Sequence, residues 1–162
     1  MSLKSMDDLF LHLVKDIYYA EKQILKALPK MAKKTENDEL KQAFQNHAKE
    51  TEGQVERLEQ VFEMLDKAPR GEKCPAILGL IEEGEEVMEE GEEGSVIDAG
   101  LLAGAQAVEH YEMSRYGTLI AWAKQLGLND AVPLLEQTLE EEKKADKLLT
   151  QIALKEVNRQ AA

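Results

Sequence analysis

Cysteine, proline and aromatic residues are all scarce in this sequence. The one cysteine, Cys74, cannot form an internal disulfide, so nothing indicates an oxidising compartment. Aromatic residues make up only 5% of the chain, and a core so poor in rings must consist mainly of aliphatic side chains, which suits helices better than sheets. Only four prolines and ten glycines interrupt the chain, and several of them gather at residues 69–94. The composition therefore favours helices.

Long apolar runs and clusters of basic residues are also missing. No run approaches the roughly 20 apolar residues that cross a bilayer. The start, MSLKSMDDLFLHLVKD, carries charges every few residues and lacks the apolar stretch of a secretory signal. We therefore expect a cytoplasmic protein with no membrane partner. The net charge of −12 argues against nucleic acid as a partner, because binding its backbone needs clustered Lys and Arg.

Apolar residues recur at spacings of three and four along four long segments, which is the pattern of amphipathic helices. We expect these helices at about residues 5–34, 38–66, 98–126 and 130–157. Ser5 followed by Asp8 is typical of a helix start, and Pro29 should kink or loosen the first helix. The segment between the second and third helices reads as loop and turn around a short helix at about 76–91.

The lengths of the connections predict how the helices are arranged. Short connections at residues 34–37 and 127–129 make two antiparallel hairpins. Each helix spans about 40 Å, and the middle connection is long enough to travel that distance and set helices two and three parallel. Up-down bundles with one long crossover are the ferritin-like arrangement. We predict an all-α fold: a ferritin-like four-helix up-down bundle with a long helical crossover between helices two and three, in a single domain of residues 1–162.

Acidic residues interrupt the apolar stripes near the middle of all four helices. Glu21, Glu50, Glu112 and Glu142 each lie 13 to 17 residues from a hairpin turn, so at about 1.5 Å per residue they share one layer. A carboxylate buried alone costs several kcal/mol or becomes neutral. One such Glu is more often a boundary residue with its tip in water, but matching depth on four helices predicts bound cations.

A short internal repeat pairs the same carboxylates. The string MAKKTEND at residues 31–38 parallels WAKQLGLND at residues 122–130, with one residue inserted. This register aligns Glu50 with Glu142, Gln54 with Asp146 and Glu21 with Glu112.

Five longer strings resemble one known family. They are DIYYAEKQILKALPKM, HAKETEGQVERLEQVFE, GLIEEGEEVMEEG, AVEHYEMSRYGTLIAWAKQLG and TLEEEKKADKLLTQIA. In this order, and over nearly the whole chain, they look like the YciE/YciF family of bacterial ferritin-like stress proteins. The resemblance implies a ferritin-like bundle, a homodimer and a link to bacterial stress responses. It also implies a di-iron centre of the rubrerythrin kind.

The sequence departs from the wider ferritin pattern at two nitrogen ligands. Ferritins and rubrerythrins have Glu-x-x-His on the second and fourth helices, whereas residues 50–53 read ETEG and residues 142–145 read EKKA. Substitutes lie nearby, so we take eight residues as candidate metal ligands: Glu21, Glu50, Glu109, Glu112, Glu142, Asp146, Gln54 and His47. We expect two divalent metal ions, iron first, with Mn, Mg or Ca left open because the site is poor in nitrogen.

Residues near this set have simpler interpretations. We expect His110 on the surface or at an interface, Tyr116 packed with its hydroxyl hydrogen-bonded, and Cys74 silent in a loop.

Two functions of different classes remain open. In the first, a metal pair uses a small oxidant, O2 or peroxide, and the protein oxidises Fe(II) or reduces peroxide. In the second, the bundle is a non-catalytic stress or scaffold protein whose metals are structural or absent. A cage-forming iron store is less attractive, because the helical insert at Ile77–Glu90 would occupy surface that ferritins use for cage contacts.

Overall fold

The computed structural model describes residues 3–162, and every regular element in that range is helical. The elements are α1 (Met6–Lys34), α2 (Asp38–Met64), α3 (Pro75–Glu90), α4 (Gly94–Leu126), α5 (Ala131–Ile152), the π-helical turn η1 (Ala153–Val157) and the short α6 (Asn158–Ala161). The predicted all-α class is confirmed.

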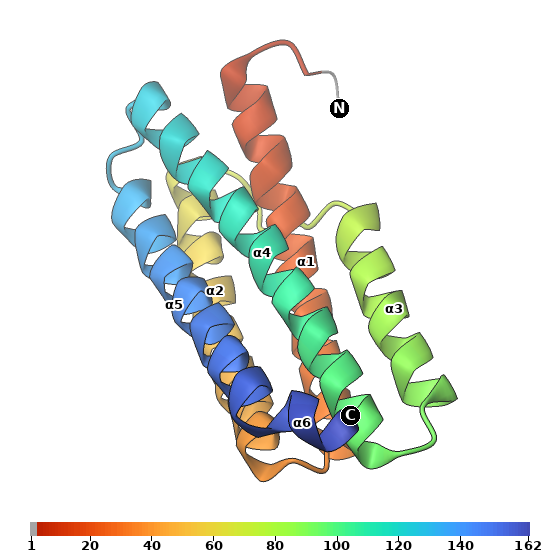
Figure 1. Ribbon diagram of the computed structural model, residues 1–162. Coiled ribbons are helices and arrows are strands. Elements are labelled where there is room, and N and C mark those ends of the chain that lie inside the picture. The colour runs from red at the N-terminus through yellow and green to blue at the C-terminus, as the bar shows by residue number, and fades with distance from the viewer. Residues whose placement is uncertain (1–2) are drawn as a thin grey trace.

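The four long helices form a bundle of two antiparallel hairpins, α1–α2 and α4–α5 (Figure 1). Helix α1 packs against α2 and α4, and α5 packs against the same two helices, so α2 and α4 are diagonal partners that run parallel. Helix α3 lies outside the bundle against α1 and α4 and covers the seam between them. This is the predicted up-down bundle with a helical crossover.

Local capping explains where the first two helices begin. The Ser5 hydroxyl accepts from the backbone N–H of Asp8 at 3.1 Å, and the Asp8 carboxylate accepts from the backbone N–H of Ser5 at 3.2 Å. This reciprocal pair satisfies two donors that a helix start otherwise leaves free. The Asn37 side chain caps α2 with a single hydrogen bond, accepting from the Leu40 N–H at 2.9 Å. Helix α1 continues past Pro29 to Lys34.

Helix α4 begins at Gly94, four residues earlier than the expected start at residue 98. The segment that reads as a turn is instead the first turn of α4, because Asp98 anchors it. The buried Asp98 carboxylate accepts the backbone N–H groups of Glu36 at 3.0 Å and Asn37 at 2.8 Å. The start of α4 is thereby joined to the loop between α1 and α2.

At two positions the structure explains why the residue is glycine. Gly127 ends α4 at a φ of 73°, in the left-handed region that glycine adopts without strain. At Gly100 on α4, a Cβ atom would lie 2.6 Å from a methyl carbon of Val87 on α3. The absence of that atom lets the crossover helix approach α4 closely.

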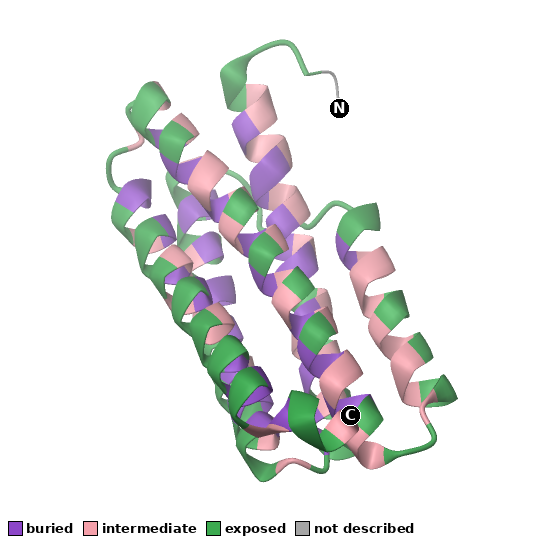
Figure 2. Ribbon diagram, in the orientation of Figure 1, coloured by how far each residue is buried: buried purple, intermediate pink, exposed green. Residues whose placement is uncertain are grey.

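The core lies between the four long helices, where the buried residues face inward and the exposed residues face solvent (Figure 2). It consists mostly of Leu, Ile, Val and Ala side chains, with Phe10, Phe62 and Tyr116 among the largest that are fully buried. No helix among residues 3–162 is both long enough and apolar enough to span a membrane. The polar cluster at mid-bundle lies within this aliphatic core.

Candidate metal centre

Four buried side chains from three helices converge near the centre of the bundle. His47 on α2, Glu109 and Glu112 on α4, and Glu142 on α5 each offer one ligand atom, and these atoms lie within 4.8 Å of one another. The His47 Nε2 atom is 3.4 Å from Glu109 Oε1 and 3.8 Å from Glu142 Oε2. Carboxylates and an imidazole at this separation are a donor set that holds divalent cations.

The fourth helix of the bundle contributes Glu21, which is fully buried on α1. Its carboxylate accepts a hydrogen bond from the Tyr116 hydroxyl. The Gln54 side-chain amide on α2 donates a hydrogen bond to Glu142 on α5. All four helices of the bundle therefore supply polar groups to one layer, and Tyr116 and Gln54 orient two of the acids.

Burial and mutual repulsion raise the pKa of Glu21, Glu109 and Glu112. Burial, followed by repulsion from Glu142, raises the pKa of Glu21 from 4.5 to about 8. The pKa values of Glu109 and Glu112 also lie well above the usual range, first because burial disfavours their charged forms and then because of neighbouring carboxylates. Burial alone would lower the pKa of His47, but the carboxylates around it, Glu50 first, raise that pKa overall.

Many polar atoms of the cluster have no hydrogen-bond partner within the protein. Among residues 3–162, nine buried side-chain nitrogen and oxygen atoms have no such partner, and eight of these nine atoms lie in or beside the cluster. The eight atoms are on Glu21, His47, Gln54, Glu109, Glu112 and Glu142. An unsatisfied buried polar atom costs about 1–3 kcal/mol, so one layer concentrates a large penalty. Divalent cations bound by these oxygens and nitrogens would remove it, and the residues therefore fit a metal site.

The structure gathers six of the eight candidate ligands and leaves two at the margin. Glu50 is exposed on α2, with 49% of its side chain accessible, and its carboxylate is 3.8 Å from His47 Nδ1 on the solvent side. Asp146 is half-buried and accepts from Gln106 on α4 at 3.2 Å, and it pairs with His110 at the same distance. The inward position on α2 is therefore held by His47 and Gln54 rather than by Glu50.

The environments predicted from the sequence for residues near the cluster agree with the structure in part. His110 lies on the surface, as expected, and Tyr116 is packed with a hydrogen-bonded hydroxyl. Cys74 is the last loop residue before α3; it is buried, and its sulfur lies 3.1 Å from the Tyr111 hydroxyl. Arg57 was not anticipated.

Arg57 braces α2 against α5 beside the cluster. Its guanidinium pairs with Glu141 and donates to the Thr138 hydroxyl at 3.0 Å. The signal in the sequence was slight: Arg57 lies three residues after Gln54, one turn along the same face.

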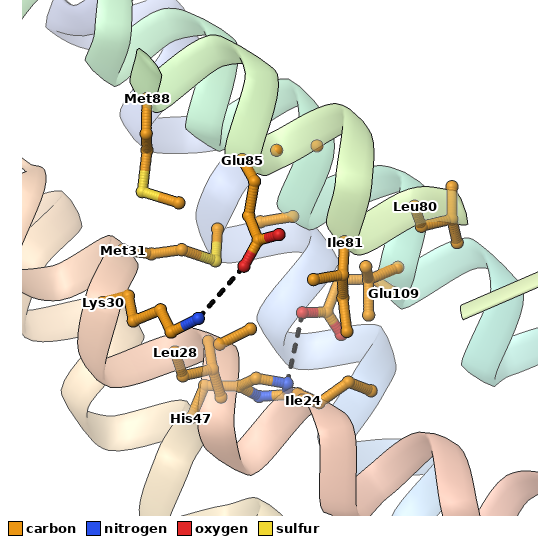
Figure 3. Close-up of a pocket in the computed structure, with 15 residues that line it drawn as sticks. Ile24, Leu28, Lys30, Met31, His47, Leu80, Ile81, Glu85, Met88 and Glu109 are labelled. Carbon is orange, nitrogen blue, oxygen red and sulfur yellow. Dashed lines mark hydrogen bonds and ion pairs between the residues drawn. The ribbon is translucent and has the colours of Figure 1, made fainter. Parts of the chain in front are cut away.

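Two openings lead to the cluster from opposite seams of the bundle. One lies under α3, between α1 and α4, and has His47 and Glu109 at its inner end (Figure 3). The other lies between α2 and α5, with Asn46, Glu50 and Lys144 in its lining, and also reaches His47 and Glu109. The cavity volume is about 40 Å³ for the first and about 140 Å³ for the second.

The fold and this layer define a class: a ferritin-like four-helix bundle with a buried carboxylate–histidine cluster able to hold metal. Comparison with known proteins gives the family. Residues 5–162 match the model of the domain of unknown function DUF892. The chain is 49% identical over 162 residues to the protein YciF of Escherichia coli K12, covering 99% of this chain and 98% of that protein. The chain belongs to the DUF892 family, which includes YciF.

Solved structures agree with this assignment. The crystal structure of the E. coli stress protein YciF matches with a TM-score of 0.92 and 50% identity, over 96% of this chain and 99% of that chain. YcfI from Rhodopseudomonas palustris matches with a TM-score of 0.92 and 51% identity, over 94% and 97% of the two chains. A protein from Xanthomonas campestris, at 18% identity and a TM-score of 0.71 over 91% and 90%, shares the fold.

Proposed function

We propose that this chain is a carboxylate-bridged dinuclear metal protein of the bacterial stress response, and that it oxidises Fe(II) or reduces peroxide. One observation carries the proposal: eight buried polar atoms without protein partners lie in a single layer of the bundle. Such a concentration is destabilising unless ligands occupy it. The match to a relative described as a stress protein supports the cellular role.

The donor set supports two divalent ions, with iron as the first choice. Glu21, Glu112 and Glu142 approach from three helices and would hold the ions together with His47 and Glu109. His47 and Glu109 also line both openings. One imidazole among several carboxylates suits Fe and Mn, and the small share of nitrogen keeps Mg and Ca open.

When bound, iron supplies the electron transfer to O2 or peroxide that amino-acid side chains cannot perform. The protein's own groups bind, orient and exclude water. Tyr116 and Gln54 hold Glu21 and Glu142 in position, because each donates a hydrogen bond to one of them. The aliphatic layers around the cluster keep the local dielectric low. Burial and the neighbouring carboxylates raise the pKa of Glu109 and of Glu112, so these two acids keep their protons to a higher pH than ordinary glutamates do.

Metal analysis of purified protein, with an anomalous-scattering map, tests this proposal. We expect two ions per chain in the wild type, and a loss of at least one in Glu112→Gln and in Glu142→Gln, which keep the shape of the side chain but remove its charge. Glu52→Gln, an exposed residue on the same helix as His47, is the matched control and should keep both ions. Fe(II) oxidation by O2 or by peroxide, followed optically, then tests turnover. Two bound ions without any such turnover would remove the catalytic half of the proposal.

The alternative function is a non-catalytic scaffold, and one observation favours it. Because the pKa of Glu21 is about 8, this acid can be neutral near pH 7 without any metal. A protein that uses its bundle only as a scaffold should tolerate the double change Glu21→Ala and Glu142→Ala with unchanged or higher stability. A dinuclear protein should instead lose its metals and the stability they confer.

We propose a homodimer in the cytoplasm as the working form. The family relationship supports this, and size-exclusion chromatography with light scattering tests it directly. A monomer or a cage-sized particle would contradict it.

A further inference from the structure

The opening under α3 is a poor passage for an ion on its way to the cluster. Its cavity volume of about 40 Å³ has room for about three water-sized positions. Lys30 on α1 and Glu85 on α3 both line it, and they pair at 3.0 Å and so tie the two helices together (Figure 3). Most of its other lining side chains are aliphatic. An ion entering here would give up its water with no polar group to replace it before the inner end.

The opening between α2 and α5 is larger and offers polar groups at both ends. Its cavity volume of about 140 Å³ has room for about ten water-sized positions, so water can enter with an ion. Asn46, Glu50 and Lys144 are exposed and form its mouth, whereas His47 and Glu109 are buried at its inner end. This opening therefore presents ligand atoms to an ion both at the surface and at the cluster.

His47 connects the two ends of this opening. Only 6% of the residue is accessible, and neither ring nitrogen has a hydrogen-bond partner. Its Nδ1 atom lies 3.8 Å from the carboxylate of the exposed Glu50, and its Nε2 atom lies 3.4 Å from that of the buried Glu109. Donor atoms less than about 4 Å apart can contact one divalent ion together, because each ligand bond is about 2.0–2.2 Å long. The imidazole therefore links an exposed acid to a buried one.

We propose that divalent ions reach the cluster through the opening between α2 and α5, where Glu50 captures them at the mouth and His47 passes them to Glu109. This role for Glu50 rests on the dinuclear site proposed above, and it explains an acid that lies beside the cluster without belonging to it. Lys144, on the α5 side of the same mouth, carries a positive charge that opposes capture. Removing each of these two charges should therefore change the rate of entry in opposite directions.

Stopped-flow mixing of the metal-free protein with Co²⁺, whose visible absorption changes on coordination, measures the rate of loading. Glu50→Gln should load about three- to tenfold more slowly than the wild type, and Lys144→Gln should load faster by a similar factor, because each variant changes by one unit the charge near the path of a divalent ion. Both effects should shrink at about 0.5 M salt, which screens charges within a few ångströms.

Glu52→Gln is the matched control for these charge variants. Glu52 is exposed on α2 and lines neither opening, so its variant should load within about twofold of the wild-type rate. A Glu50→Gln protein that loads as fast as the wild type, or a Lys144→Gln protein that loads no faster, would overturn the proposal.

Two variants that fill space test the passage itself. Ala145 on α5 lines the opening between α2 and α5, whereas Gly84 on α3 lines the other opening and has nothing within 4 Å of its Cβ position. Ala145→Leu should slow loading by at least about tenfold, and Gly84→Leu should stay within about twofold of the wild type. Leucine is a good helix former, and thermal unfolding checks that both variants fold. Equal rates in these two variants, or slower loading in Gly84→Leu, would overturn the proposed route.

The final metal content separates an entry residue from a ligand. At saturation every variant should hold as many Co²⁺ ions per chain as the wild type, because the side chains assigned to the ions are unchanged. Fewer ions in Glu50→Gln would make Glu50 a ligand and overturn its role in entry. If the wild type binds two ions and all variants load at its rate, the dinuclear proposal stands and the route falls. A wild type that binds no Co²⁺ removes both.

Discussion

Removing the metals and raising the pH should destabilise the bundle, and Glu21 sets the expected size of the effect. The folded protein holds the Glu21 proton with a pKa of about 8, against 4.5 for an ordinary glutamate. The difference corresponds to about 5 kcal/mol of unfolding free energy. A typical domain has about 5–15 kcal/mol in total, so the effect is large enough to measure.

The direction follows from which state binds the proton more tightly. The folded state does, so its stabilising contribution is complete below about pH 4.5, declines as the pH rises, and is lost above about pH 8. The raised pKa values of Glu109, Glu112 and His47 act in the same direction. Bound metal reverses this dependence, because it requires the ionised acids and its affinity increases as protons leave.

Urea unfolding followed by circular dichroism, in the presence of a chelator, measures this between about pH 5 and pH 8. The free energy of unfolding should fall steadily over that range for the wild type, and by less in Glu21→Gln, which stays neutral. Glu52→Gln, exposed on α2, should follow the wild type. Metal-saturated protein should show a flat or rising dependence. A metal-free protein whose stability does not fall with pH would refute the reasoning from burial to proton uptake.

Three smaller effects should follow from single contacts. Tyr116→Phe removes the donor to the buried Glu21 and should cost about 1–3 kcal/mol in the metal-free protein, measured by urea unfolding; an unchanged midpoint would mean that the hydrogen bond contributes nothing. Asp98→Ala leaves the N–H groups of Glu36 and Asn37 without their acceptor and should cost about 2–4 kcal/mol, with Asp98→Asn costing less; equal stability of all three proteins would contradict the anchoring role. Cys74 is buried against the Tyr111 hydroxyl, so its thiol should react with a disulfide reagent only as the protein unfolds, and rapid labelling of the folded protein would show that α3 opens locally.

The fold was largely predictable because the helical pattern is strong and because capping residues mark where helices begin. Ser5 with Asp8, and Asn37, mark the starts that the structure uses for α1 and α2. The start of α4 was misjudged because its anchor, Asp98, acts through the backbone of a loop about sixty residues away. The spacing of residues in the sequence does not predict such a contact.

The candidate site was predictable as a layer but not in its details on α2. Glu50 and His47 are three residues apart, which places them only about 60° apart around a helix. The rotation of α2 is decided by packing of residues such as Phe44, Thr51 and Leu58 into the core. That rotation turns His47 inward and leaves Glu50 at the surface. The internal repeat pointed to Glu50 because alignment compares positions along the chain and not their burial.

The placement of one layer of candidate ligands on four separate helices also bears on how the protein folds. Each hairpin, α1–α2 and α4–α5, is local in sequence and can form early, whereas the cluster exists only once the two hairpins have docked. Until then the acids are solvated and have no common binding geometry. We therefore expect an ion that binds only the completed layer to stabilise the native state more than the transition state for folding. Metal should slow unfolding and leave the folding rate nearly unchanged. The ion would then stabilise the assembled bundle without initiating its folding.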